Sequence, residues 1–402
     1  MEKKANVVPV STAGEYLKDQ VKLRIGLIGI GNAGNQVVNS AYKEGFTEVF
    51  AINSSERDLS DSNVNASIPS FLVGDEARGA GKNREKAKEL FKINGKKLFA
   101  VPAFDHIVRN SDILFVIGST AGGTGSGIGP DMAYLLANSY PHKIVIFYGI
   151  LPKLSDSITA QNNCINCLHE INSMNIPFML TDLSFWENIP NDIAYVECAK
   201  HTIECINVIK GKYLYETVNN SIDENDMRTI VGESGYLSVY QVDRITSVQV
   251  DQETIQSLMI KRIKKSPSVM IQKDEIIKQL GVIVNCPDEI MEAAKTGNYS
   301  ELTDFIGMPL GVFENYTVTN GSVGQFITIL SGMNLPYSRL QQCIQIIEQH
   351  EEKLKRVKKI DLSNEVDRFD FLNSTNVADK LVNSAKVKED SNKQGVLDSF
   401  FK

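Results

Sequence analysis

The feature that most constrains the fold is a glycine-rich segment between an apolar run and an amphipathic run. Residues Ile113–Gly118 have the pattern of a buried strand, and the sequence GSTAGGTGSG over 118–127 leads into a predicted helix at about Ser126–Ala137. Bare glycine amides at a strand-to-helix junction let the backbone approach a negatively charged group, and the helix dipole favours that charge. The segment therefore predicts an anion site at the carboxyl end of a strand.

Two further glycine-rich stretches precede it. Gly29–Gly34 follows the apolar run Leu23–Ile30 and fits GxGxxG, and Gly79–Asn83 reads GAGKN in a loop. Neither this loop nor the segment 118–127 has the Gly-Lys-Ser/Thr spacing of a P-loop. Any one stretch is explained by a tight turn, but the three together indicate one polyphosphate held from several sides.

Apolar strands alternate with helices over the first half of the chain. The predicted strands are residues 23–30, 48–53, 113–118, 143–150 and 177–181. Continuous apolar strands separated by helices are typical of a parallel sheet covered on both faces, which gives an α/β fold class. The apolar spacing over Asp192–Ile209 predicts a long helix that leaves this domain.

The pattern changes beyond about Met227, where alternating segments predict a smaller α+β domain, followed by a long helix that starts at Pro336 and runs to about Lys359. The predicted division is an N-terminal extension with a short helix (1–22), a nucleotide-binding domain (23–190), a central helix with its following loop (191–226), a second α+β domain (227–335), a long C-terminal helix (336–360) and a flexible, polar tail (361–402). The strands of the second domain are predicted at 237–250, 281–285, 316–319 and 325–331.

Composition limits the classes of function. The 402 residues include 42 basic and 49 acidic ones, a net charge of −7 that disfavours direct binding to nucleic acid or to an anionic membrane. The longest apolar runs are about eight residues, against roughly 20 for a membrane helix. The N-terminal residues show no secretory signal, and six cysteines do not make a disulfide scaffold. We therefore expect a cytoplasmic protein.

The glycine-rich segment is similar to a known family signature. GGTGSG over Gly122–Gly127 resembles the phosphate-binding motif of the tubulin/FtsZ superfamily of GTPases. The stretch Gly31–Gln36 resembles the first nucleotide loop of tubulin, Gly79–Asn83 resembles the γ-phosphate loop, and Asn220–Ile230 resembles the loop after the central helix. Leu330–Pro336 is similar to the final strand of the second domain. The resemblance spans about residues 22–358.

The resemblance implies a site and a mechanism. It implies GTP and GDP as ligands, with Mg²⁺ carried by the nucleotide and no direct protein ligand to the metal. It implies that Asp223 and Asp226 are catalytic and act on the nucleotide of the next subunit, so that hydrolysis accompanies head-to-tail assembly into a filament. The implied nucleotide-binding residues are Gly31, Asn32, Ala33, Gln36, Asn53, Gly81, Lys82, Asn83, Gly122, Gly123, Thr124, Gly125, Ser126, Gly127 and Asp182.

Within the superfamily, the short N-terminal helix, the long helix after Pro336 and the tail resemble TubZ-type DNA-segregation tubulins. This implies plasmid or phage DNA positioning, with a DNA-bound adaptor protein contacting the C-terminal tail. The chain departs from the FtsZ pattern at three places: Asn53-Ser54-Ser55 replaces Asn-Thr-Asp, Ser221 replaces an Asn, and Asp182 follows the fifth strand where an Asn that pairs with guanine is usual.

Other interpretations remain open at this point. Asp223 and Asp226 also fit a solvated acidic loop that caps a helix. The GxGxxG stretch also fits an NAD-binding enzyme, although the second strand ends without the acidic residue that binds a ribose hydroxyl. An FtsZ-like division or phage-centring filament and a scaffold that binds nucleotide without hydrolysis are further alternatives.

Some apparent motifs have simpler explanations. Cys164, Cys167 and His169 resemble part of a zinc or redox motif, but no second CxxC exists, and we predict that this segment is a packed helix. Cys198 and Cys205 are predicted to be core residues of the central helix. The basic run Lys353–Lys359 is either a solvated helix end or a patch that docks a partner.

Overall fold

The computed structural model describes residues 23–60, 64–74, 79–215, 221–269, 271, 276–295 and 299–360, and for 356–360 it describes the backbone alone. The predicted N-terminal extension with its short helix (1–22), Asn220 and the predicted tail (361–402) lie outside the described residues. Among the residues described, no helix is both long enough and apolar enough to cross a membrane.

The strands form one ten-stranded sheet in the order β3-β2-β1-β4-β5-β6-β7-β10-β8-β9. Neighbours from β3 to β7 are parallel, β10 is antiparallel to both β7 and β8, and β9 is parallel to β8. The bounds are β1 (Ile25–Ile30), β2 (Val49–Asn53), β3 (Ser70–Leu72), β4 (Ile113–Ser119), β5 (Ile144–Leu151), β6 (Pro177–Asp182), β7 (Gly235–Ile245), β8 (Ile277–Cys286), β9 (Pro309–Val318) and β10 (Gly324–Met333).

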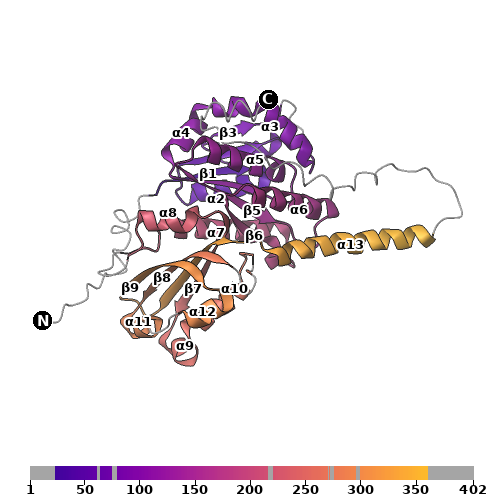
Figure 1. Cartoon of the computed structure of the whole chain (residues 1–402). Helices are drawn as coiled ribbons and strands as arrows, with labels where there is room; N and C mark the ends of the chain where they lie inside the picture. Colours follow the sequence, from indigo (N-terminus) through magenta and orange to yellow (C-terminus); the bar gives the residue numbers. More distant parts are fainter. Residues whose placement is uncertain are drawn as a thin grey trace.

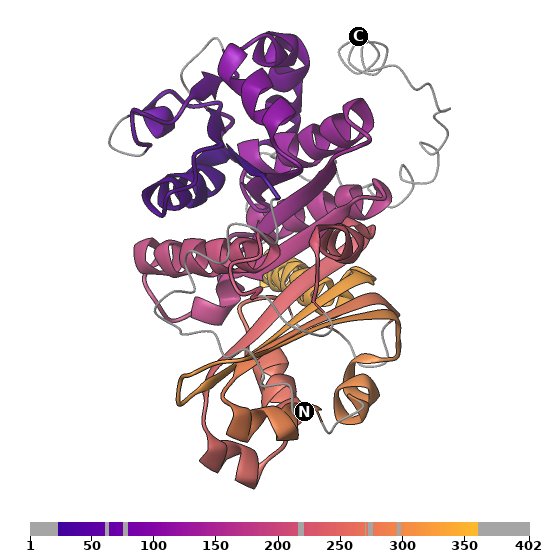
Figure 2. The ribbon, with the colours of Figure 1, turned by 90° about the vertical axis from the view of Figure 1, so that its left-hand side faces the viewer.

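Helices cover both faces of this sheet, as the continuous apolar strands predict (Figures 1 and 2). One face packs on α2 (Gly31–Lys43), α7 (Asn191–Ile209) and α8 (Glu224–Gly232). The other packs on α3 (Arg84–Phe99), α4 (Pro102–Asn110), α5 (Thr124–Ser139), α6 (Ile158–Ser173), α10 (Ile255–Lys264), α11 (Asp288–Lys295), α12 (Ser300–Ile306) and α13 (Tyr337–Ile360). The short helices are η2 (Arg57–Leu59), η3 (Leu183–Trp186) and α9 (Ser247–Gln252).

The sheet continues across the boundary that the sequence predicts between the two domains. β6 and β7 pair at Pro177 with Gly235 and at Phe178 with Tyr236. The predicted strand 237–250 is too long, because β7 ends at Ile245. The side chains of Thr246 and Gln249 form a reciprocal capping box that starts α9 instead.

The last helix, α13, returns to the first domain after β10. It packs against α6 and buries Leu340 and Cys343 in the core. From Glu348 to Lys355 every side chain is exposed, and in Figure 1 this half of the helix extends away from the body of the molecule. Within the described residues, only the first turns of α13 therefore pack against the rest of the protein.

Candidate functional site

A cavity of about 440 Å³ opens at the carboxyl ends of the first strands. It lies where the strand order reverses between β1 and β4, which is the usual place for a ligand in an open parallel sheet. Its lining follows the strand ends: Ile30–Ala33 after β1, Asn53–Ser55 and Asp58 after β2, Gly79–Lys82 before α3, Ser119 and Ala121–Gly125 after β4, Asp156 and Ala160 after β5, and Tyr195 on α7.

Two helix N-termini face this cavity. The cap residues of α2 and α5 are Ile30 and Gly123, and neither has a side-chain hydrogen bond to the free amides of the first turn. Neither first turn contains an acidic residue. Unpaired amides together with the positive ends of two helix dipoles favour a bound anion such as a phosphate chain.

The glycine-rich loops are tied to one another. The hydroxyls of Ser54 and Thr124 lie 2.7 Å apart, and the Asn163 amide donates to the carbonyls of Lys82 at 2.9 Å and Ala121 at 3.0 Å. Arg84 is buried, donates to the Ser126 carbonyl at 2.9 Å and pairs with Glu170 at 2.6 Å. These contacts fix the second and third loops and the end of β2 relative to one another before any ligand binds.

The glycines of the third loop have different reasons to be glycine. A Cβ atom on Gly125 would lie 2.8 Å from the backbone nitrogen of Ser119, and one on Gly123 would lie 2.8 Å from that of Asn83. A Cβ atom on Gly122 would have no neighbour closer than the Ser119 Cβ at 4.0 Å. Gly123 and Gly125 therefore permit close packing of the loops, whereas Gly122 leaves open space in the cavity.

Charged and unpaired polar groups are few at the cavity. Of the described residues that line it, Lys82 is the only cation, and Asp58 and Asp156 are the acids. The side chain of Asn35, on the first turns of α2, is 1% exposed, and neither its oxygen nor its nitrogen has a hydrogen-bond partner. Asn35 does not line the cavity, whereas Asn53 does, and the Asn53 side-chain nitrogen also has no partner. A buried amide nitrogen without a partner is costly, so Asn53 is a candidate to bind a polar edge of a ligand.

The structure places most of the predicted binding residues together. Those that line the cavity are Gly31, Asn32, Ala33, Asn53, Gly81, Lys82, Gly122, Gly123, Thr124 and Gly125. Those outside the lining are Gln36, Asn83, Ser126, Gly127 and Asp182.

Three of the residues outside the lining have structural contacts instead. Asn83 caps α3 by accepting from the Lys86 amide at 3.0 Å. The Ser126 hydroxyl donates to the Gly122 carbonyl. Asp182 forms a buried ion pair at 2.6 Å with Arg339 of α13, so the structure gives the predicted guanine-side residue a different partner.

Several lining residues were not predicted: Ser54, Ser55, Asp58, Ser119, Ala121, Asp156, Ala160 and Tyr195. Asp156 follows a predicted parallel strand, so the rule that ligands lie at carboxyl ends could have identified it. Tyr195 carries no such signal, because its place depends on how α7 packs against α2.

Asp223 and Asp226 lie away from the cavity and form a capping box at the start of α8. The Asp223 carboxylate accepts from the Asp226 amide at 2.9 Å, and the Asp226 carboxylate accepts from the Asp223 amide at 3.1 Å. Arg228 of the same helix pairs at 3.3 Å with Asp112, which precedes β4. The acidic loop therefore lies near the amino ends of the strands, and the cavity lies at their carboxyl ends.

The apparent zinc motif is part of the core. Cys164 and Cys167 are buried in α6, whereas His169 is exposed, so the three residues do not converge. Cys198 and Cys205 are buried on α7, as predicted. No group of three or more His, Cys, Asp or Glu side chains that could hold a metal ion occurs within the described part of the chain.

The strand order β3-β2-β1-β4-β5-β6 is also the order of dinucleotide-binding folds. In those folds an acidic side chain at the end of the second strand binds the ribose hydroxyls. Here β2 ends at Asn53, whose oxygen accepts from the Ser54 amide at 2.8 Å and from the Ser55 amide at 3.3 Å. Its oxygen already has two donors, so this position does not reproduce the dinucleotide pattern.

Comparison with known proteins agrees with this geometry. Residues 24–179 match the family model described as Tubulin/FtsZ family, GTPase domain. The tubulin-like protein CetZ of Methanothrix thermoacetophila is 23% identical over 347 residues, which is 77% of this chain and 85% of that protein. The tubulin-like protein TubZ of Clostridium botulinum C phage is 32% identical over 152 residues, which is 38% of this chain and 41% of that protein.

Solved structures share the fold. The GTPγS-form protofilament of TubZ from Bacillus thuringiensis serovar israelensis superposes with a TM-score of 0.64 at 17% identity, covering 86% of this chain and 98% of that one. At this identity the likeness concerns the fold alone. It extends over the second domain, which the family model does not reach.

Proposed function

We propose, from the premise that residues 24–179 are a GTPase domain of the Tubulin/FtsZ family, that this protein binds GTP in the cavity and hydrolyses it when a second copy docks head to tail. The second copy contributes Asp223 and Asp226. Hydrolysis and assembly are then one coupled process, and the product is a filament.

The observation that carries this proposal is the position of the acidic loop relative to the cavity. The loop lies near the start of β4 and the cavity lies at its end, and the 7 residues of that strand separate them by about 20 Å. The two carboxylates are therefore too far away to act on the nucleotide of their own subunit. Stacking a second copy along the strand direction brings its loop over the cavity.

Different residues of the chain would then have different roles in binding and hydrolysing the nucleotide. The amides of Gly122–Gly125 and the N-termini of α2 and α5 hold the phosphates, and Lys82 neutralises part of their charge. Asn53 is the group that we assign to the nucleoside, since it lines the cavity and its buried side-chain nitrogen is unpaired. The carboxylates of the second copy orient the attacking water, which is most of what phosphoryl transfer requires of a protein.

The donor set fits a magnesium ion that is carried by the nucleotide. Asp58 and Asp156 are the acidic residues at the described lining, and each comes from a different loop, so they do not form a protein cage. Bound Mg²⁺ would neutralise charge on the phosphates.

The test is the dependence of GTP hydrolysis on protein concentration, together with an Asp226→Asn variant. Asparagine keeps an oxygen that accepts from the Asp223 amide, so the capping box stays while the charge is lost. We expect hydrolysis per molecule of the natural protein to rise above a threshold concentration, and Asp226→Asn to bind GTP and assemble but to hydrolyse it at least 100-fold more slowly. Glu224→Gln, at the neighbouring carboxylate, is the matched control. Full turnover at high dilution would contradict the proposal.

The cellular role that we propose is positioning of plasmid or phage DNA, because a phage TubZ is 32% identical over 152 residues of this chain. The 42 residues after Ile360 would recruit a DNA-bound adaptor. Truncation after Thr375 should leave GTP hydrolysis within twofold of the full chain and remove adaptor binding. Loss of hydrolysis in the truncated chain would place the tail in the enzyme instead.

An FtsZ-like division or phage-centring filament is the second candidate, since the cell division protein FtsZ 1 of Pyrococcus abyssi is 24% identical over 247 residues, which is 57% of this chain and 61% of that protein. The two roles share the GTPase and the filament. Co-purification of the full chain with a DNA-bound adaptor favours segregation, whereas filaments that form without any adaptor at a division site favour the alternative.

A further inference from the structure

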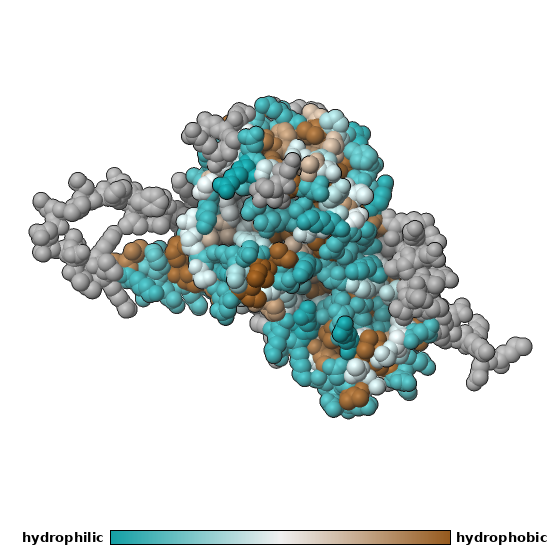
Figure 3. Space-filling model, turned by 180° about the vertical axis from the view of Figure 1, so that it is seen from behind, coloured by the Kyte–Doolittle hydropathy of each residue, from teal (hydrophilic) through white to brown (hydrophobic). Residues whose placement is uncertain are grey.

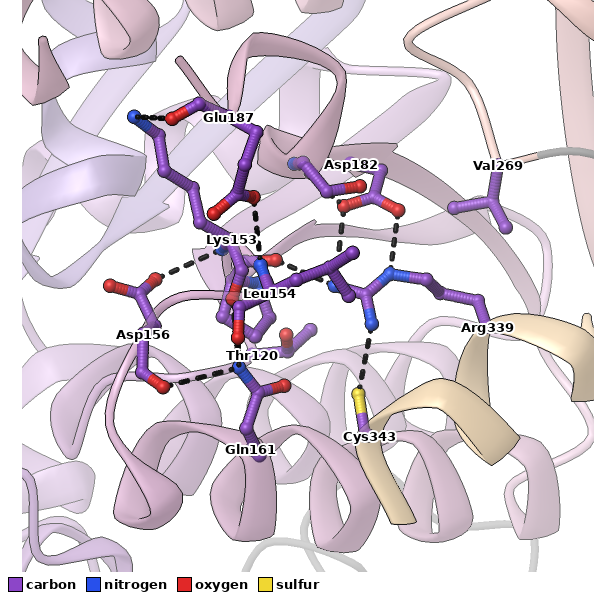
Figure 4. Close-up of polar contacts among 12 residues, drawn as sticks. Thr120, Lys153, Leu154, Asp156, Gln161, Asp182, Glu187, Val269, Arg339 and Cys343 are labelled. Carbon is purple, nitrogen blue, oxygen red and sulfur yellow. Dashed lines mark hydrogen bonds and ion pairs between the residues drawn. The ribbon is translucent and has the colours of Figure 1, made fainter. Parts of the chain in front are cut away.

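The loop Pro152–Ser157, between β5 and α6, joins the cavity to the rest of the molecule. Its Asp156 lines the cavity and accepts a hydrogen bond from the Lys153 amide at 3.0 Å. The Gln161 side chain is fully buried and donates to the Lys153 carbonyl at 2.7 Å. Figure 4 shows these side chains converging on the loop. Hydrogen bonds of polar side chains, rather than packing of the loop's own apolar residues, therefore hold the backbone of this loop.

A second support comes from the segment after β6. The Glu187 carboxylate accepts from the amides of Leu154 at 2.9 Å and Ser155 at 3.0 Å. Burial opposes ionisation of Glu187, but a hydrogen bond from the Ser155 side chain, these two amides and the charge of Lys153 keep its pKa below the ordinary value. The position of the loop thus depends on where the η3 segment lies.

Arg339, near the start of α13, contacts both the loop and the residue that starts the supporting η3 segment. Its guanidinium donates to the Pro152 carbonyl at 2.7 Å and to the Asp182 carboxylate at 2.6 Å, and its side chain is 4% exposed. Asp182 in turn accepts from the Ser184 amide at 2.9 Å, which starts η3. One side chain of α13 therefore holds the first residue of the loop and the first turn of the segment that supports it.

The contribution of the buried Arg339–Asp182 ion pair to stability does not by itself explain why the pair is there. Taking a guanidinium and a carboxylate out of water costs several kcal/mol, and such pairs often stabilise a protein no better than apolar residues would. What the pair supplies is geometry, since a guanidinium offers donors in a fixed planar arrangement. Few other side chains of α13 are buried, with Leu340 and Cys343 next to Arg339 in the core.

We propose that Arg339 is a positioning residue for the cavity, so that a bound nucleotide and the docking of α13 on α6 stabilise each other through Pro152 and Asp182. The inference rests on the proposed function, because the ligand is a nucleoside phosphate. Coupling of this kind is reciprocal: if docked α13 tightens nucleotide binding, nucleotide holds α13 down by the same factor. The exposed half of α13 and the residues beyond it would then report the state of the cavity.

The first test needs no substitution. Cys343 is a residue of α13, is fully buried where this helix packs on α6, and accepts a hydrogen bond from Arg339 at 3.1 Å, so a thiol reagent reaches it only when α13 lifts. A hydrogen bond from the Cys164 thiol, together with the Arg339 charge and against the effect of burial, holds the pKa of Cys343 below its ordinary value. We expect saturating GDP, below the assembly threshold, to slow labelling of Cys343 at least fivefold, as measured by mass spectrometry.

Cys286 is the internal control, because it is equally buried but lies on β8 in the second domain. Its labelling rate should not change with GDP. Equal Cys343 rates with and without GDP, in protein that binds GDP, would overturn the link and leave the proposed function intact. A chain that binds neither GTP nor GDP would overturn the proposed function and the link with it.

The second test uses Arg339→Gln and Arg339→Lys. Glutamine loses the charge and the fork, and lysine keeps the charge without the fork. We expect the GDP dissociation constant of Arg339→Gln to rise about tenfold and its Cys343 labelling to become insensitive to GDP, with Arg339→Lys between it and the natural protein. Arg228→Gln removes an ion-paired arginine near the other ends of the strands and should bind GDP normally. Normal GDP affinity in folded Arg339→Gln would overturn the proposal, and if that variant does not fold, the labelling of the natural protein decides.

Discussion

At the scale of single residues, neighbouring glycines in one loop have separate functions. The glycine-rich sequence predicts a phosphate site but does not say which glycines approach the ligand. Gly123 and Gly125 have no room for a side chain because other backbone lies against them, whereas Gly122 borders the open cavity. A substitution at Gly125 tests packing and ligand binding together, whereas one at Gly122 separates them.

The first prediction therefore concerns Gly122→Val. The new side chain enters the cavity without meeting backbone, so the free energy of unfolding should change by less than about 0.5 kcal/mol. Affinity for GDP should fall at least tenfold, or about 1.4 kcal/mol. Gly125→Val is the contrast, with unfolding weakened by about 1–3 kcal/mol. Titration calorimetry and urea unfolding measure the two effects, and normal GDP affinity in folded Gly122→Val would remove this loop from the site.

The second prediction concerns the charge at the cavity. Lys82 is exposed at the edge of the lining and has a φ of 63°, a left-handed conformation that few non-glycine residues adopt. Lys82→Ala should weaken GTP binding about tenfold and GDP binding about twofold, because the third phosphate carries the added charge. Lys86→Ala, on the exposed side of α3, is the control. An equal effect on both nucleotides would show that Lys82 does not distinguish the third phosphate.

At the scale of elements, the start of α8 combines a structural and a proposed chemical role. The capping box explains why two carboxylates lie at this position even without chemistry. The sequence alone could not distinguish a helix cap from a catalytic loop, because both require two acidic residues spaced three positions apart. Only the placement of α8 relative to the cavity favours catalysis in a second copy.

A mixing experiment tests this element. Asp226→Asn keeps a complete cavity and lacks one carboxylate, and Gly122→Val keeps the carboxylate and lacks the cavity. Neither variant alone should hydrolyse GTP at more than a few per cent of the natural rate. An equimolar mixture should recover activity severalfold above the sum of the two, because the loop of one acts on the GTP of the other. A mixture that shows only the sum would place both parts of the site in one subunit.

The central helix α7 contains a histidine, His201, that makes the free energy of unfolding depend on pH. Burial, aided by the charge of Arg262, lowers the pKa of His201 to about 4. The His201 ring lies 3.0 Å from the Ser268 hydroxyl, which donates to the Val239 carbonyl and so accepts from the ring. The neutral ring therefore ties α7 to the segment that precedes β8.

The sign follows from the lowered pKa. The unfolded chain, with a histidine pKa of about 6.5, takes up the proton before the folded chain does, so stability is complete above pH 6.5 and is lost as the pH falls toward 4. Between pH 7 and pH 5 the loss from this group is at most about 2 kcal/mol, and it is smaller if water reaches the partly exposed ring. His201→Gln should flatten this dependence in urea unfolding at the two pH values. An unchanged slope would contradict the assignment.

At the scale of the whole molecule, the surface suggests where a second copy docks. Figure 3 shows a mostly hydrophilic surface on which hydrophobic side chains form small separate groups. One group of exposed apolar residues lies on η3 and the start of α7, beside Tyr195 of the cavity: Phe185, Ile189, Ile193 and Val196. A copy that closes the cavity would cover this group.

The last prediction concerns this surface. Ile193 is 49% exposed, so Ile193→Lys should leave the free energy of unfolding and the affinity for GDP unchanged below the assembly threshold. A charge in the contact should raise the threshold concentration for assembly at least fivefold, as followed by light scattering with GTP. Val248→Lys, at an exposed apolar position on α9, is the matched control. An unchanged threshold in Ile193→Lys would place the contact elsewhere.

The sequence by itself determined the parts of this protein that depend on local pattern. Apolar runs predicted five strands of the first domain, β1, β2, β4, β5 and β6, within about two residues, because a strand that is buried on both faces is apolar throughout. The prediction missed the short, half-exposed β3 and all but the end of β9, where polar and exposed positions interrupt the apolar pattern. The glycine loops and the strand ends gave most of the cavity lining, because the carboxyl ends of parallel strands meet at one edge. The core positions of Cys198 and Cys205 followed from helical spacing in the same way.

Only the tertiary structure decided which distant residues meet. Asp182 follows a strand end like the other predicted ligands, yet it lies against Arg339, which is 157 residues away. Tyr195 reaches the cavity because α7 packs on α2, and the sheet continues from β6 into β7 because two strands from different predicted domains pair. Such contacts depend on the packing of whole elements, and no local spacing in the chain encodes them. The same reason places the acidic loop at the opposite edge of the sheet from the cavity, which is why we propose that it acts on the nucleotide of a second copy.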